Sequence, residues 1–210
     1  MMRSLLSLTA SAAAYGFSIG ISNSWVYAMR NLVKFPVLIL STAAICALLY
    51  HVLARFLDAH FNFLQVQRLV LGIFRDISRL LAALSPAVCF LGVTMERPNG
   101  RDLGGYPQFL LLNVFAIAIC GCLSVYLRSR DRISNSIKMP KHRNLLIVCW
   151  MAASLAVGGQ VCWMIRPFFG TSGAGAWETP WFSGTHPDKR GASNFYIAVY
   201  YLIVPPDGWK

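Results

Sequence analysis

Few side chains in this sequence have the types and spacings that catalysis or metal binding requires. The six cysteines all fall within apolar runs, where cysteine acts as a small apolar residue, and their spacing fits neither a zinc site nor a disulfide framework. They are Cys46, Cys89, Cys120, Cys122, Cys149 and Cys162. His142 and His186 have no carboxylates at ligand spacing, and the glycine-rich segment 170–175 is not followed by Gly-Lys-Ser/Thr, so it is expected to be a loop. The sequence therefore predicts no catalytic residue and no metal ligand, and it implies no cofactor beyond bound lipid.

The composition explains why reactive groups are scarce. Of the 210 residues, 56% are hydrophobic and only 13% are charged, with a mean hydropathy of +0.53. Soluble domains carry about 25% charged residues. The net charge of +11 would suggest nucleic acid in a soluble domain, but here the basic residues separate apolar runs. That pattern is typical of a membrane protein whose loops contact anionic lipid, so nucleic acid is not expected as a partner.

Five apolar runs predict an all-α, polytopic membrane protein. Each run is close to the roughly 20 residues that a spanning helix needs, and backbone groups in the bilayer must be satisfied within the helix. The expected spans are 5–27, 35–56, 80–95, 106–127 and 145–165. Pro36 would open the second span in its first turn, and the third is short and contains Pro86. Residues 1–170 would form the bundle, and residues 171–210 would lie outside the membrane.

The segment 65–79 differs from the spans because it is amphipathic. A stripe of polar and basic residues, Gln65, Arg68, Gly72, Arg75, Asp76 and Arg79, runs along one face. Apolar residues fill the other face. Such a helix either lies at the membrane interface and runs into the third span, or docks on another protein.

The distribution of Lys and Arg predicts the orientation. The short loop from Arg128 to Arg143 is densely basic, and positive charge beside a span end resists translocation. We therefore expect a cytoplasmic N-terminus and a C-terminal segment on the opposite, periplasmic side.

Small residues in the first span form a regular pattern. Ala12, Gly16, Gly20 and Ser24 recur every four residues and share one helix face, where another backbone can approach closely. This seam fits either packing within the chain or contact with another subunit. Polar residues within the spans are few, chiefly Asn113 and Gln160, and no charged residue lies deep in a predicted span. Hydrogen bonds between helices are the expected role of both.

The C-terminal segment is rich in aromatic residues. Residues with the character of interface anchors or partner contacts are Arg166, Phe168, Trp177, Trp181, Phe195 and Tyr200. The apolar run 194–204 is too short to span a membrane. It would lie along the outer membrane face or pack into a neighbour.

Several short motifs together resemble a group of bacterial multi-span inner-membrane proteins that are loosely similar to Yip1-type membrane domains. They are Tyr15-Gly16 with Gly20, Lys34-Phe35-Pro36-Val37-Leu38, Leu84-Ser85-Pro86, Gly159-Gln160 with Trp163, Arg166-Pro167-Phe168-Phe169-Gly170, and Asn194-Phe195-Tyr196. The resemblance implies a helical fold in a bacterial inner membrane and implies no reaction. The long loop 171–193 departs from the pattern.

These features favour a non-catalytic structural or accessory subunit of a larger membrane complex, with lipids and other integral membrane subunits as partners. Two alternatives stay open. A small transporter or channel component would need a polar path or an inverted repeat. A membrane enzyme acting on lipid would need clustered reactive groups near an interface.

Overall fold

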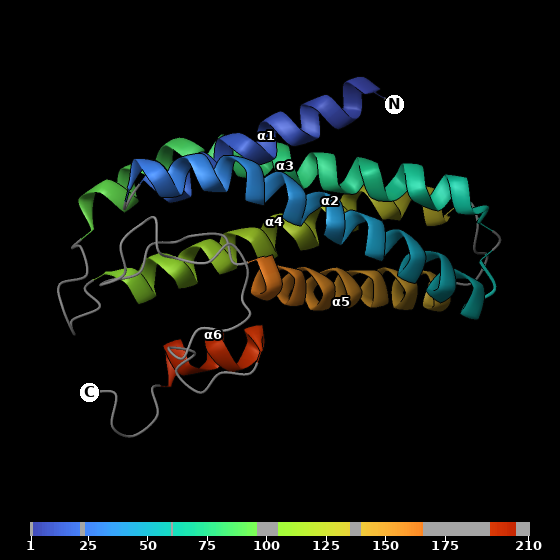
Figure 1. Ribbon diagram of the computed structural model, residues 1–210. Coiled ribbons are helices and arrows are strands. Elements are labelled where there is room, and N and C mark those ends of the chain that lie inside the picture. Colours follow the sequence, from blue (N-terminus) through green and yellow to red (C-terminus); the bar gives the residue numbers. More distant parts are fainter. Residues whose placement is uncertain are drawn as a thin grey trace.

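The computed structural model describes residues 2–21, 24–59, 61–95, 105–134, 140–165 and 194–204, and within them every regular element is a helix. The long helices are α1 (Met2–Ile21), α2 (Trp25–Phe56), α3 (Phe63–Thr94), α4 (Tyr106–Ser134) and α5 (Pro140–Ile165), followed by the short α6 (Phe195–Ile203). Figure 1 shows the long helices side by side in one elongated bundle, with α6 beside one end. Five helices in the described part of the chain are long and apolar enough to cross a membrane. The all-α fold is thereby confirmed.

The connection between α1 and α2 differs from the predicted spans. The apolar run 5–27 does not form one helix, because Ser24 has extended backbone angles and its hydroxyl accepts a hydrogen bond from the amide of Val26. A serine in this position caps a helix N-terminus and starts a new helix. The helix that contains the predicted second span therefore begins at Trp25, ten residues before residue 35. Pro36 lies inside α2, well beyond its first turn.

The seam of small residues packs α1 against α2 of the same chain. Ala12 is fully buried. A Cβ atom added to Gly16 would lie 2.6 Å from both the Asn31 oxygen and the Phe35 Cβ, and one added to Gly20 would lie 2.5 Å from Ala28 backbone atoms. Only residues without a side chain allow so close an approach of two helices. The geometry thus supports the packing alternative for these glycines, while Ser24 serves as the cap of α2.

The predicted amphipathic segment and the third span form one helix. α3 is continuous from Phe63 to Thr94, and the Gln65 side chain accepts a hydrogen bond from the Asn62 amide at its start (3.1 Å). The apolar face of segment 65–79 is buried, including Val70 and Ile73. Because α3 contacts α1, α2 and α4, that face packs on helices of its own chain.

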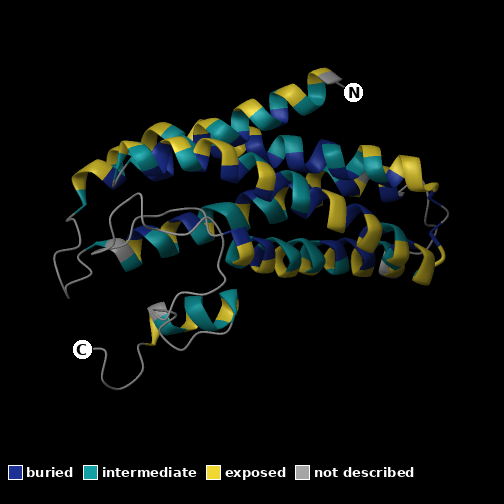
Figure 2. Ribbon diagram, in the orientation of Figure 1, coloured by how far each residue is buried: buried dark blue, intermediate teal, exposed yellow. Residues whose placement is uncertain are grey.

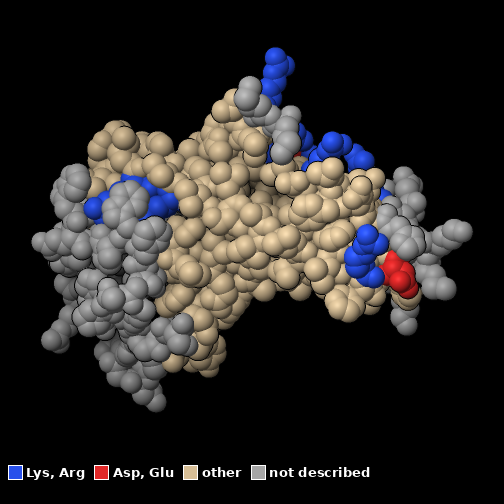
Figure 3. Space-filling view, turned by 45° about the vertical axis from the view of Figure 1, so that its right-hand side comes forward, with Lys and Arg blue, Asp and Glu red and all other residues tan. Residues whose placement is uncertain are grey.

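The outer surface of the bundle is strongly apolar. Figure 2 shows exposed residues along the outer sides of the long helices. On α4 the exposed side chains recur at helical spacing and form an outward stripe: Leu112, Phe115, Ile119 and Leu123. In Figure 3, Lys and Arg lie at the left-hand end, along the upper edge and on the right-hand side, and a broad zone of other residues separates the left-hand group from the rest. An apolar belt bounded by charge is the surface expected of a membrane-spanning bundle.

Helix α6 packs on α5 and α4 of its own chain. The Asn194 side chain caps it by accepting a hydrogen bond from the Ile197 amide (3.0 Å). The Tyr196 hydroxyl donates to the carbonyls of Leu155 (3.2 Å) and Ala156 (2.8 Å). Partial burial raises the pKa of the Tyr196 hydroxyl above its ordinary value, so it stays a donor. Phe195 lies over Gly159, where an added Cβ would come within 2.8 Å of the ring.

Replacing the seam glycines should destabilise the isolated protein. Gly16→Ala and Gly20→Ala each place a methyl group against α2, and overpacking of this kind costs about 1–3 kcal/mol in the free energy of unfolding. The thermal unfolding midpoint of the purified protein in mild detergent would measure the loss. Ala14→Leu is the control, because Ala14 is exposed on the same helix. Unchanged midpoints for both glycine variants would contradict this packing role.

Candidate functional site

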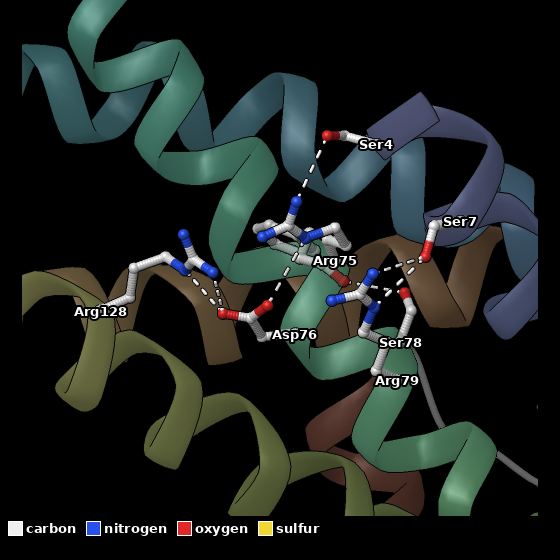
Figure 4. Close-up of polar contacts among 8 residues, drawn as sticks. Ser4, Ser7, Arg75, Asp76, Ser78, Arg79 and Arg128 are labelled. Atoms are coloured by element: carbon white, nitrogen blue, oxygen red, sulfur yellow. Dashed lines mark hydrogen bonds and ion pairs between the residues drawn. The ribbon is translucent and has the colours of Figure 1, made fainter. Parts of the chain in front are cut away.

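A cluster of charged and hydroxyl side chains joins α1, α3 and α4 (Figure 4). Arg75 on α3 donates from Nη1 to the Ser4 hydroxyl on α1 (3.3 Å). One turn later, Arg79 donates from Nε (3.3 Å) and Nη2 (3.1 Å) to the Ser7 hydroxyl. The spacing of four residues on α3 and three on α1 places each pair on facing sides of the two helices. We call Arg75, Asp76, Arg79 and Arg128 the arginine cluster.

Asp76 connects this cluster to α4. Arg128 donates from Nε to the Asp76 carboxylate (2.6 Å), and its Nη2 lies 2.5 Å from the same oxygen. The second carboxylate oxygen lies 3.6 Å from Arg75 Nε. Gly72 makes room for this arrangement, because a Cβ atom there would come within 2.8 Å of Arg128 Nη1. Charge-assisted contacts of this length are the strong class of hydrogen bond.

The cluster carries more positive than negative charge. The cluster holds three guanidinium groups and one carboxylate. Arg75 and Arg128 contact the carboxylate, and Arg75 and Arg79 each donate to a neutral serine hydroxyl. Of the eight acidic residues in the sequence, only Asp76 and Asp131 fall within the long helices, and the Asp131 side chain lies outside the described residues. About a quarter of the Arg75 side chain and a third of that of Arg128 are exposed, and Arg79 is exposed, so the cluster is partly buried and reaches the surface.

The depth of the cluster follows from the register of the helices. Ser4 precedes Gly16 by 12 residues, or about 18 Å of helix. Gly16 contacts Asn31 and Phe35, so on the antiparallel α2 the level of Ser4 corresponds to about residues 43–47. The Cys46 sulfur on α2 lies 4.0 Å from the Ser154 hydroxyl on α5. These positions are near the middle of the stretches 35–54 and 144–165, which hold no Asp, Glu, Lys or Arg.

Two charged groups lie outside the predicted spans but within the long helices. The arginine cluster is level with the middle of the uncharged stretches of α2 and α5. Lys34, predicted to lie between spans, is inside α2 and only 3% exposed. Its ammonium group donates to the Ile165 carbonyl at the end of α5 (3.1 Å). A lysine at a helix C-terminus satisfies the last carbonyl groups and complements the helix dipole.

Other polar residues join the helices in pairs. The Tyr15 hydroxyl on α1 donates to the Asn113 side-chain oxygen on α4 (2.8 Å), and Asn113 also donates to the Phe109 carbonyl (2.7 Å). Asn113 is fully buried, as its expected bonding role requires, whereas Gln160 is exposed on α5.

The contact between α2 and α5 is reciprocal. The Tyr50 hydroxyl donates to the Trp150 carbonyl (3.0 Å) and is 2.5 Å from the Ser154 hydroxyl. The Trp150 indole donates back to the Tyr50 carbonyl (3.2 Å), and the two rings stack at 4.5 Å. Each helix thus bonds the backbone of the other. Sequence reasoning missed this pair because two aromatic residues in apolar spans have no distinctive spacing.

The remaining predicted positions are distributed as follows. Phe195 and Tyr200 lie on α6, and Tyr200 is 56% exposed. Arg166, Phe168, Trp177 and Trp181 lie outside the described residues. Within the described ranges, no group of three or more His, Cys, Asp or Glu side chains could hold a metal ion.

Comparison with known proteins assigns no family: no family model matches the chain, and no curated protein or solved structure is significantly similar to it.

Removing the Asp76 charge should loosen the contact between α3 and α4. In Asp76→Asn, Arg75 and Arg128 lose their shared carboxylate, and a hydrogen bond to a charged group contributes about 1.5–3 kcal/mol. The expected result is a lower thermal unfolding midpoint in detergent. Asp58→Asn is the matched control, because Asp58 is exposed in a turn at φ 54°, which asparagine tolerates. Equal shifts in the two variants would mean that only net charge matters.

Proposed function

We propose that the protein is a non-catalytic structural or accessory subunit of a larger membrane complex. The observation that carries this proposal is the use of interior polar side chains to bind one helix of the chain to another. Tyr15 bonds Asn113 between α1 and α4, and Tyr50 bonds α2 to α5 through Trp150. Such groups stabilise a fixed bundle, because separating them in hydrocarbon leaves each without a partner.

The outward-facing apolar surfaces of the helices are suited to contact with other apolar partners. The α4 stripe, which includes Phe115 and Ile119, is exposed along the bundle. Tyr200 and Ile203 are exposed on α6. Other integral membrane subunits and lipids are the partners suited to such surfaces. Following the resemblance in the sequence, we place the protein in a bacterial inner membrane with its N-terminus in the cytoplasm.

The second candidate is a small transporter or channel component, and the arginine cluster is the observation that favours it. Ionisable residues at membrane depth commonly mark an ion or substrate path. The paired contacts of Asp76 with Arg128 equally suit a fixed link between α3 and α4. The accessory role is preferred because the other interior polar groups also join helices.

Extraction of the native membranes with mild detergent tests the accessory role. On a native gel, the chain should migrate with larger subunits at constant stoichiometry, which mass spectrometry of the band would name. A small, solitary particle at several detergent concentrations would count against a stable complex. In that case, anion flux into vesicles holding the purified protein, lost on Arg79→Gln, would support the transport alternative.

The proposed orientation is tested by labelling single cysteines in intact cells. All native cysteines are replaced, and Ser136→Cys (between α4 and α5) or Ser183→Cys (between α5 and α6) is introduced. An impermeant thiol reagent should label position 183 and leave position 136 unlabelled until the cells are opened. Equal labelling of the two positions in intact cells would refute five spans.

A further inference from the structure

The uncharged, apolar stretches end at different levels on different helices, and the arginine cluster lies where they end on α1 and α3. We call this offset the step in the apolar surface. On α1 and α3 the uncharged stretches begin next to it, at Ser4 and Leu80. On α2 the uncharged stretch continues from the level of the cluster, about residues 43–47, to residue 54, which is roughly 10–17 Å further. Figure 3 shows the same offset. On its right-hand side, Lys and Arg at the upper edge, where α1 and α3 lie, are closer to the middle of the molecule than those at the lower edge.

This step places charged groups where lipid headgroups can reach them. Arg79 is exposed, so the cluster is open to the surface beside α1 and α3. A headgroup resting on the shorter apolar side would lie against it, while acyl chains would cover the longer side formed by α2 and α5. Bilayers adapt to such offsets by local thinning, at a modest cost per ångström.

The guanidinium groups keep donors that their described partners do not use. An arginine carries five N–H donors. Arg79 directs two nitrogens at one neutral hydroxyl, Ser7. The buried Arg75 Nε is paired with the Asp76 carboxylate only at 3.6 Å, which is too long for a hydrogen bond. With three guanidinium groups and one described carboxylate, Asp76, the cluster retains a charge of +2 (three minus one). An excess of positive charge at a partly buried site attracts an anion.

We infer that the arginine cluster binds the phosphate group of an anionic ligand, held by Arg75 and Arg79 with the hydroxyls of Ser4 and Ser7 close by. Arginine suits this role because its planar fork binds two phosphate oxygens at once. The phosphate could belong to an anionic phospholipid headgroup or to a soluble phosphate, which share this chemistry. The inference does not depend on the accessory role, since it concerns a ligand of the isolated chain.

Thermal unfolding of the full chain in neutral detergent tests this site. Short-chain phosphatidylglycerol, short-chain phosphatidylcholine and inorganic phosphate are titrated in parallel, with tryptophan fluorescence as the readout. Phosphatidylglycerol should raise the unfolding midpoint, and Arg79→Gln should weaken that effect about tenfold in concentration, the change expected from losing one charge-assisted contact. Arg68→Gln is the matched control, because Arg68 is exposed on the same helix about three turns earlier.

The outcomes separate the two sources of phosphate. If inorganic phosphate acts at the same concentrations as phosphatidylglycerol, and Arg79→Gln weakens both, the ligand is a soluble anion. If only the anionic lipid acts, the ligand is a headgroup. Equal effects of phosphatidylglycerol and phosphatidylcholine on the wild type would overturn the inference without any variant. So would equal weakening by Arg68→Gln and Arg79→Gln, since it would show only general attraction to basic residues.

Discussion

The close contact between α1 and α2 fixes the level of the N-terminal helix, and the charged contacts depend on that level. Gly16 and Gly20 let the two backbones approach very closely. If α1 moved along α2, larger side chains would come into this narrow contact and clash. With this register set, Ser4 and Ser7 reach the arginines of α3. A shift of one turn, about 5.4 Å, would separate hydroxyls and guanidinium groups. The close backbone contact at the two glycines thereby determines where the polar contacts form.

Different kinds of contact hold the helices together on the two sides of the bundle. Between α2 and α5, Tyr50 and Trp150 each donate a hydrogen bond to the other's backbone carbonyl, and their rings stack. This pair is therefore uncharged, and its two side-chain donors are satisfied within the bundle. Between α3 and the helices α1 and α4, the contacts are charged and partly open to the surface. A neutral clamp is compatible with hydrocarbon on its outer side. A charged one needs headgroups or water within reach, which the step in the apolar surface provides.

The number of helices and their apolar character could be predicted from the sequence, because backbone groups in a bilayer leave few alternatives to a helix. The limits between elements could not. The apolar run 5–27 continues through Ser24, and only its capping geometry shows that a helix begins there. For the same reason Lys34 was expected between two spans, whereas it lies within α2 with its ammonium group buried against the end of α5. Hydropathy averages over about 20 residues, and one cap or one satisfied charge does not change the average.

The arginine cluster shows a second limit. Its three α3 residues, Arg75, Asp76 and Arg79, belong to the polar stripe of the predicted amphipathic segment 65–79, and that pattern says nothing of the opposite side of the contact. Ser4, Ser7 and Arg128 come from helices distant in sequence, and hydroxyls are common in apolar helices. The informative feature was the lone acid Asp76 among arginines. An aspartate in a basic stripe lowers the attraction to anionic lipid, so its presence is better explained by a specific arginine partner, and α4 supplies one in Arg128.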